Sequence, residues 1–524
     1  MLQSHRAVVA SVLGLAIAPA AFPDWSTDPS ANTPVAVAPN DTVEPKVVAL
    51  PGPTGEGCYV SWYDNRGGGY DVYLQRFDRM GNPLWAANGI QIADTTFSSV
   101  EDYGLAADAS GHAVLAFRDT RFGGTSAPAC TVTRVSPDGV QVWGPNGKQV
   151  TLPGVGANKP EVCVASDGDI VAAWIQGSGT AMQRLSPEGT LRWATPKLLT
   201  ATGSLFTTDI QPSGATGSVI VSLLSYTTFT GPKTLRCMKV NADGTNAWPA
   251  LVPVFTTGSL QFGNFPSFVP NNDGGAFFAW YTTSPLQVFA QRISGSGAPM
   301  WGTNGIAVAT TAGRDRTSPS LALEPATGQL LVAWVEELPP PQNGTSCRAQ
   351  LFDSAGTRLW TNAGAEVTPM TASYDTQDVV AQWFDYKPTV VQSTYSSFNS
   401  AVLSARQFSL KGKPTWTTVV CNHPTAHSDT ACAAVNESLV VVWEDPRNDS
   451  NDLYGGAVNT DGTLGPPPTE GDPADLNGDG VVNAADLAIL LGAWGPASPG
   501  TPADINGDGE VNAADLTILL SSWS

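Results

Sequence analysis

Residues 288–309 read Val288-Phe-Ala-Gln-Arg-Ile-Ser-Gly-Ser-Gly297-Ala-Pro-Met-Trp301-Gly-Thr-Asn-Gly305-Ile-Ala-Val-Ala309. Two short apolar runs, Val288–Arg292 and Gly305–Ala309, flank a turn-forming stretch of Gly, Ser, Pro and Asn. Runs of this length bounded by such residues are typical of β-strands joined by turns. The stretch also places a glycine four residues before a tryptophan, and this spacing recurs along most of the chain.

Seven copies of the Gly–Trp spacing follow one another at intervals of 50 to 59 residues. They are Gly81/Trp85, Gly139/Trp143, Gly189/Trp193, Gly244/Trp248, Gly297/Trp301, Gly356/Trp360 and Gly412/Trp416. Each copy also has an apolar run that follows a proline, as at Pro319, and a second run that often ends in Trp, as at Trp334. Four strands in a repeat of this length are the content of one β-propeller blade.

The two ends of the repeat region complement each other. An eighth unit begins at Ser438 but stops near Gly462, before its Trp and its last strand. Trp25 followed by Pro34–Ala38 supplies the missing pieces at the other end of the chain, which would close a ring and pair an open sheet edge. The sequence therefore predicts an all-β domain over residues 22–464, an eight-bladed propeller closed by an N-terminal strand. Seven blades is the alternative, because units four and seven lack the second-strand Trp. The region resembles secreted bacterial β-propeller repeat proteins.

The composition fits a secreted protein. Only 14% of the 524 residues are charged, and the net charge is −20. The charge distribution has no basic stripe, which argues against nucleic-acid binding. Residues 1–21 have the order of a signal peptide, with a basic start, the apolar run Ala7–Ala18 and small residues at the expected cleavage point. That run is too short to span a membrane, and no later segment could do so. We therefore expect an extracellular or cell-surface location.

The composition changes at residues 465–471, where three consecutive prolines predict a stiff linker. From Glu470 to the end there are nine acidic residues and no basic ones. Within this tail, residues 475–491 are repeated as residues 504–520 with 14 of 17 positions identical.

Each repeat has the ligand spacing of an EF-hand-type Ca²⁺ loop, with oxygen ligands at positions 1, 3, 5, 9 and 12, a backbone carbonyl at 7 and glycine at 6. Hard oxygen donors without His or Cys select Ca²⁺ over zinc. Two bound Ca²⁺ ions are therefore expected. The predicted ligands are Asp475, Asn477, Asp479, Val481, Asn483 and Asp486 in the first loop, and Asp504, Asn506, Asp508, Glu510, Asn512 and Asp515 in the second.

An apolar stretch predicted to be helical follows each loop, at Leu487–Trp494 and Leu516–Trp523. A loop and a helix, occurring twice around a Pro/Gly connector, resemble a type I dockerin domain over residues 472–524. The resemblance implies a small helical domain that needs two Ca²⁺ ions to fold and binds a cohesin domain of a scaffold protein. It also assigns partner recognition to loop positions 10 and 11. Those positions are held by Ala484 and Ala485 in the first loop, and by Ala513 and Ala514 in the second.

Two smaller motifs each have two interpretations. The pattern aromatic-x-Asp-x-Arg occurs at Trp62–Arg66, Phe117–Arg121 and Trp443–Arg447. Its recurrence in several units favours an Asp–Arg pair that holds a turn, over a ligand site.

The segment Cys421–Cys432 contains two Cys and two His, His423 and His427. A disulfide or free thiols are expected for Cys421 and Cys432, with tetrahedral zinc as the alternative.

The sequence has no recognisable nucleophile or acid–base set. We therefore expect a secreted calcium-binding protein that docks on a cohesin scaffold and presents a propeller for binding polysaccharide or a surface ligand. Because dockerin domains are commonly carried by enzymes, the alternative is a glycoside hydrolase or polysaccharide lyase in polysaccharide catabolism. The sequence identifies no catalytic residue.

Overall fold

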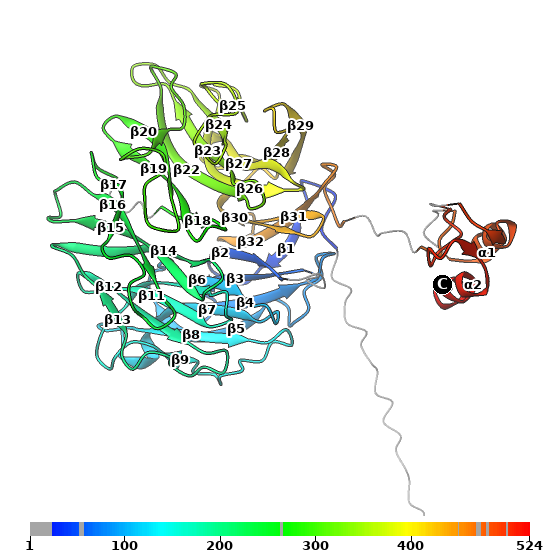
Figure 1. Cartoon of the computed structure of the whole chain (residues 1–524), viewed down its shortest axis with the longest axis horizontal. Coiled ribbons are helices and arrows are strands. Elements are labelled where there is room, and N and C mark those ends of the chain that lie inside the picture. The colour runs from blue at the N-terminus through cyan, green and yellow to red at the C-terminus, as the bar shows by residue number, and fades with distance from the viewer. Residues whose placement is uncertain are drawn as a thin grey trace, which may run out of the picture.

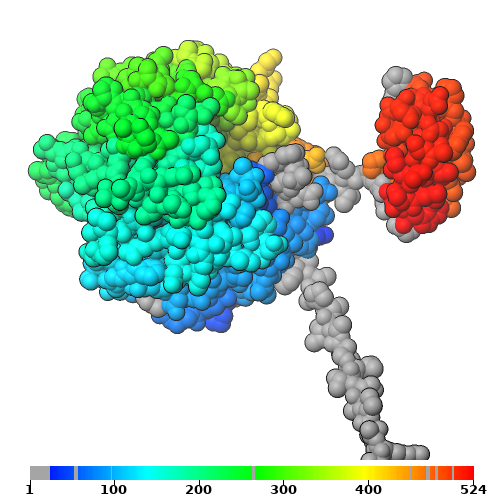
Figure 2. Space-filling model, turned by 60° about the horizontal axis from the view of Figure 1, so that its bottom comes forward, coloured from blue at the N-terminus to red at the C-terminus, as the bar shows by residue number. Residues whose placement is uncertain are grey.

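The computed structural model describes residues 24–51, 57–261, 266–448, 450–467, 473–477, 482–498 and 501–523. The predicted signal peptide and most of the predicted linker lie outside these ranges. Eight four-stranded antiparallel sheets follow one another around a ring, as Figure 1 shows. The colours of the space-filling view pass around this body from blue through cyan and green to yellow, so that blades consecutive in sequence are neighbours in space (Figure 2). The predicted eight-bladed propeller is confirmed, and the seven-bladed alternative is wrong.

The strands of the first four blades are these: β2 (Thr42–Ala49), β3 (Cys58–Asp64), β4 (Tyr70–Phe77) and β5 (Ile90–Phe97); β6 (Gly104–Ala107), β7 (Ala113–Asp119), β8 (Ala129–Val135) and β9 (Lys148–Gln149); β10 (Asn158–Val164), β11 (Ile170–Gln176), β12 (Gly179–Leu185) and β13 (Lys197–Leu199); β14 (Ser204–Ser213), β15 (Ser218–Tyr226), β16 (Thr234–Val240) and β17 (Val252–Phe255). A short 3₁₀ helix, η1 (Thr120–Phe122), follows β7.

The strands of blades five to eight are these: β18 (Phe268–Pro270), β19 (Ala276–Thr283), β20 (Leu286–Ile293) and β21 (Ile306–Ala307); β22 (Asp315–Glu324), β23 (Gln329–Glu337), β24 (Thr345–Phe352) and β25 (Ala365–Glu366); β26 (Asp375–Phe384), β27 (Lys387–Ser397), β28 (Ser400–Phe408) and β29 (Pro414–Cys421); β30 (Ser428–Val435), β31 (Ser438–Asp445), β32 (Asp452–Asn459) and β1 (Thr33–Ala36). The first strand of each blade contacts the first strands of its neighbours and lies innermost in the ring.

The N-terminal strand β1 completes the last blade, in the sheet order β1-β32-β31-β30. Thr33 pairs with Gly455 and Pro34 with Tyr454 in antiparallel register. The strand ends at Ala36, two residues earlier than expected, because the backbone N–H of Ala38 instead donates to the Asp452 carboxylate at 3.2 Å. The predicted ring closure is confirmed, and it joins residues more than 400 positions apart.

The Gly–Trp repeat joins each blade to the next. The indole of Trp85 lies against Gly139, where a Cβ would come within 3.2 Å of the ring, and its Nε1 donates to the Pro137 carbonyl at 3.1 Å. The glycine has a positive φ of 80°, so the turn and the packing both exclude a larger residue. Equivalent contacts pair Trp143 with Gly189, Trp193 with Gly244, Trp248 with Gly297, Trp301 with Gly356, Trp360 with Gly412, and Trp416 with Gly462.

Trp25 and Gly81 supply the eighth contact of this kind. A Cβ on Gly81 would lie 2.6 Å from the Trp25 ring, and the Trp25 backbone N–H donates to the Met80 carbonyl at 2.7 Å. The second-strand tryptophans are a separate set that fills the core, and Trp62, Trp174, Trp280, Trp334 and Trp443 are fully buried. The tryptophan excess therefore comes from two positions repeated in most blades.

The C-terminal domain contains two helices, α1 (Ala484–Gly492) and α2 (Ala513–Ser521), and a short ladder between β33 (Gly495–Pro496) and β34 (Glu510–Val511). Each helix begins with a capping box, formed by Asn483 and Asp486 in α1 and by Asn512 and Asp515 in α2. The helices therefore begin three residues before the predicted positions and end two residues earlier. They share a core of Ala474, Val482, Leu490, Ala503, Val511 and Leu519. None of the helices in the described part of the chain is long and apolar enough to cross a membrane.

Candidate functional site

The second predicted calcium loop lies wholly within the described residues. The backbone N–H of Asp508 donates both to Asp504 Oδ1, at 3.1 Å, and to Asn506 Oδ1, at 2.9 Å. Gly509, with a φ of 90°, makes the turn, and its N–H donates to Asp504 Oδ2 at 2.9 Å. The side-chain oxygens of loop positions 1 and 3 thus converge on the inside of the loop, as Ca²⁺ ligands must.

Asp515 fixes the far end of this loop. It is buried, and its two oxygens accept the N–H groups of Asn506 at 3.1 Å and Asn512 at 2.8 Å. Burial alone would raise the pKa of Asp515, but these backbone donors more than offset it and lower the pKa. The carboxylate is therefore charged at neutral pH, which is the state that binds a hard cation.

The first loop repeats this arrangement where it is described. Asp486 is buried and accepts from the N–H groups of Asn477 at 3.1 Å and Asn483 at 2.9 Å. Two predicted ligands, Asp479 and Val481, lie outside the described residues, whereas Asp475 lies within them. The matching anchors give the two loops the same arrangement where both are described, and their oxygen donors fit Ca²⁺.

The four alanines predicted to recognise the partner are exposed at the starts of the helices: Ala484, Ala485, Ala513 and Ala514. Large apolar side chains are also exposed in this small domain, namely Ile489, Leu491, Trp494, Leu520 and Trp523.

The centre of the propeller carries a belt of charged side chains. In five blades the innermost strand bulges at a residue with positive φ: Glu44, Lys159, Ser318, Asp378 and Asp429. One arc of the belt is balanced by salt bridges. There Lys46 contacts Asp102 at 2.5 Å, and Lys159 contacts both Asp102 and Glu161.

The adjoining arc, in blades seven, eight and one, gathers carboxyl groups. Glu444 is buried, and its oxygens accept the Glu44 backbone N–H at 2.8 Å and the Asn451 amide at 3.0 Å. Burial and then the Asp429 charge raise the pKa of Glu444 to about 8. Burial and the same charge raise the pKa of Asp378 to about 7. At neutral pH these groups share protons among themselves.

A hollow of about 620 Å³ opens beside this acidic arc, and we call it the blade 7–8 pocket. It is lined by the starts of β26 and β30 and by the loops that follow β27 and β31, including Asp375, Gln377, Tyr395, Phe398 and Asn451. Asn451 connects the pocket to the acidic arc, because its amide donates to Glu444.

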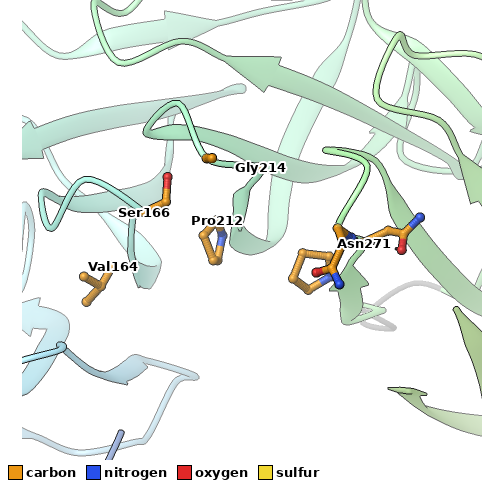
Figure 3. A pocket seen from close by; sticks show the side chains of 8 residues that line it. Val164, Ser166, Pro212, Gly214 and Asn271 are labelled. Carbon is orange, nitrogen blue, oxygen red and sulfur yellow. Dashed lines mark hydrogen bonds between the residues drawn. The ribbon is translucent and has the colours of Figure 1, made fainter. Parts of the chain in front are cut away.

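A second hollow, of about 460 Å³, lies at the opposite ends of the innermost strands, among the turns that follow β10, β14 and β18 (Figure 3). Its lining includes Val164, Ser166, Pro212, Gly214 and Asn271 and has no titratable side chain. The blade 7–8 pocket is therefore the better candidate for specific recognition.

The Asp–Arg motif forms the predicted turn-holding pairs. Arg121 donates to Asp119 in two bonds of 2.9 and 2.7 Å, and Arg66 pairs with the buried Asp64 in the same way. In blade eight the pair Asp445–Arg447 also joins a larger buried cluster with Cys421 and His427.

That cluster shows which interpretation of the Cys421–Cys432 segment holds. Cys421 and Cys432 are free thiols, which is one of the two expected forms, and the other form, a disulfide, is wrong. Cys421, His427 and Asp445 bring their donor atoms within 4.8 Å of one another, whereas His423 instead contacts Thr425. The Arg447 guanidinium pairs with Asp445 and lies 3.5 Å from the Cys421 sulfur.

This guanidinium already neutralises the position that a metal cation would need. Burial lowers the pKa of His427 to about 4 and raises that of Cys421 to about 11, so both are neutral. Cys421 donates to Asn32 at 2.9 Å. The cluster is thus a hydrogen-bonded network that holds the N-terminal segment, and of the four Cys/His residues considered as zinc ligands it brings together Cys421 and His427 but not His423 or Cys432.

Comparison with known protein families identifies the C-terminal domain. Residues 473–521 match the model of the dockerin type I domain. This part of the chain is therefore a dockerin type I domain, a kind of domain that binds calcium and a cohesin partner. The whole chain joins an eight-bladed β-propeller to that domain.

Several solved structures resemble the chain at low sequence identity. The α-L-arabinanase of Penicillium chrysogenum, complexed with arabinobiose, is 14% identical with a TM-score of 0.32, over 57% of this chain and 92% of its own. The polysaccharide lyase Uly1 is 10% identical with a TM-score of 0.42, over 81% of this chain and 91% of its own. Comparison with curated proteins gives no match. Similarity at this level assigns no activity to the chain.

Sequence reasoning missed the acidic arc and the blade 7–8 pocket. A pattern was available in the sequence, since the position that Lys159 holds at the start of its blade is acidic in four other blades: Glu44, Asp102, Asp378 and Asp429. Their grouping depends on blades that are neighbours in space but separated in sequence. Only the closed ring brings blade one beside blade eight.

Proposed function

We propose that the chain is a secreted, calcium-dependent docking protein. The dockerin domain binds a cohesin domain of a scaffold, and the propeller binds a polysaccharide or a surface ligand at that location. The observation that carries the docking role is the pair of matching loops, each anchored by a buried aspartate, Asp486 or Asp515, that holds two backbone N–H groups.

Calcium would be held by six oxygen ligands in each loop. Those of the second loop are Asp504, Asn506, Asp508, the Glu510 carbonyl, Asn512 and Asp515. The bound ion would neutralise the carboxylates that otherwise repel one another. The exposed alanine pairs at the two helix starts would then form two equivalent cohesin-binding surfaces.

Cohesin capture tests this role. Calorimetry with the full chain should show two Ca²⁺ ions bound, and a cohesin column should retain the protein with Ca²⁺ but release it with a chelator. The double variant Asp475→Ala and Asp504→Ala should not be captured. The matched control Asp461→Ala changes an exposed propeller turn and should be captured normally. Capture of the double variant would refute the assignment.

A glycoside hydrolase is the second candidate, favoured by one observation. Glu444 lies beside the blade 7–8 pocket with its pKa raised to about 8, as a general acid requires. The test is the release of reducing sugar from polysaccharides. Release by the native chain that Glu444→Gln abolishes would establish an enzyme, whereas retention without release would support binding alone.

A further inference from the structure

The blade 7–8 pocket is large enough for small-ligand recognition. Ligand sites commonly occupy 300–1,000 Å³ and combine apolar walls with a few converging polar groups. At about 620 Å³, this pocket lies within that range. Its polar lining consists mainly of amides, hydroxyls and one carboxylate, including Gln377, Asn399, Asn451 and Asp375. Groups of these kinds both donate to and accept from ligand hydroxyls.

Two aromatic side chains complete the wall. The Phe398 ring is 92% exposed at the tip of the loop between β27 and β28. Tyr395 lies three residues earlier, near the end of β27, and donates its hydroxyl to the His427 carbonyl. An exposed phenyl ring beside a polar pocket gives a flat apolar surface for the C–H face of a sugar ring.

The electrostatics of the pocket restrict the charge of its ligand. None of the residues that line the pocket is basic. Arg447, which directly follows the lining residue Pro446, is already paired with Asp445 and stacked over the Tyr454 ring at 3.8 Å. Glu444, Asp429 and Asp378 lie next to residues that form the pocket wall. A uronate, sialate or sulfate group would therefore meet the Asp375 carboxylate in the pocket wall and no cationic side chain to neutralise it.

We propose that the blade 7–8 pocket binds uncharged saccharide units, stacked on Phe398 and hydrogen-bonded by Gln377, Asn451 and Asp375, and that it excludes anionic glycans. The inference rests on the proposed polysaccharide-binding role of the propeller and adds the place and the ligand class. It also separates the two enzyme alternatives, because a polysaccharide lyase acts on uronates, which this pocket repels.

Calorimetric titration of the full chain tests the inference. The probes are neutral hexasaccharides of glucose, xylose, arabinose, mannose and galactose, and the galacturonate hexamer as the anionic counterpart. The variant Phe398→Ala removes the stacking surface. The control Phe229→Ala removes a phenyl ring that is 65% exposed in the equivalent loop of blade four.

At least one neutral hexasaccharide should bind, and the galacturonate hexamer should bind about tenfold more weakly or not at all. Phe398→Ala should weaken neutral binding by about twofold to tenfold, while Phe229→Ala should leave it unchanged. Neutral binding that is insensitive to Phe398→Ala, or equal binding of the galacturonate hexamer, would overturn the pocket assignment while leaving a polysaccharide-binding propeller intact. No binding of any hexasaccharide would overturn the polysaccharide role itself.

Discussion

Replacement of Gly81 by alanine tests how the ring is closed. Gly81 is the glycine of blade one against which the N-terminal Trp25 packs, so among the described residues this Gly–Trp contact is the one that joins the N-terminal segment to blade one. In the seven other contacts the tryptophan comes from the preceding blade in sequence. Gly81→Ala therefore perturbs ring closure without changing any strand.

The cost has two parts. Gly81 has a φ of 103°, and a side chain in such a conformation costs about 1–2 kcal/mol. An added Cβ would also lie 2.6 Å from the Trp25 ring and 2.7 Å from its backbone nitrogen, so backbone as well as side chain must move. Forced overpacking costs about 1–3 kcal/mol. The expected total is about 2–5 kcal/mol.

Gly68→Ala is the matched control, because it separates strain from contact. Gly68 lies in the same blade with a φ of 94°, but a Cβ there would meet nothing within 4 Å. It should cost only the conformational part, about 1–2 kcal/mol. The assay is equilibrium urea unfolding of the full chain followed by tryptophan fluorescence. If the two variants lose the same stability, the Trp25–Gly81 contact does not close the ring.

Three further predictions concern the acidic arc, the calcium loops and the thiols. Because folding raises the pKa of Glu444 to about 8 from an ordinary value near 4.5, the folded chain holds a proton that the unfolded chain releases, and stability should fall as the pH rises from about 5 to 8. Glu444→Gln should reduce the stability lost between pH 5 and 8 by up to about 4 kcal/mol, at roughly 1.4 kcal/mol per pH unit; an unchanged pH dependence in thermal melts would contradict the assignment. Asp515→Ala should reduce the Ca²⁺ stoichiometry by one ion in calorimetry, with two ions retained as the contrary result. A thiol reagent should label the native protein slowly, because burial raises the pKa of thiols such as Cys58, to about 12. The same reagent should label all seven cysteines of the denatured chain. Labelling of six or fewer thiols after denaturation without reductant would indicate oxidation.

The fold could be predicted because its determinants recur. In each repeat the Trp packs on the Gly of the next blade, so the fixed Gly–Trp spacing specifies the contact between blades. Because the spacing recurs, each copy supports the same prediction. The eighth unit lacks its Trp and its last strand, and the N-terminal segment supplies both, which is consistent only with a closed ring. The calcium loops were predictable for a similar reason, because metal coordination fixes both residue type and spacing over twelve residues.

The propeller pocket could not be predicted in the same way. Glu444, Asp429 and Asp378 come from two blades, and their proton sharing depends on bulges and burial rather than on spacing. The Cys421–Cys432 segment shows the opposite error, in which closeness in sequence suggested a shared site. Cys432 lies within strand β30, whereas Cys421 ends β29 and donates to Asn32 from the other end of the chain.

The closure of the ring and the blade 7–8 pocket are mechanically connected through Asn32. Its amide donates to the Val420 carbonyl at 2.9 Å, and its oxygen accepts from Cys421 and from Arg447 at 3.0 Å. Arg447 directly follows the pocket residue Pro446 and pairs with Asp445. The N-terminal segment therefore supports the loop after β31, which forms one wall of the pocket, as well as completing the sheet. If so, loosening the ring at Gly81 should weaken saccharide binding as well as stability, although Gly81 lies in blade one and does not line the pocket.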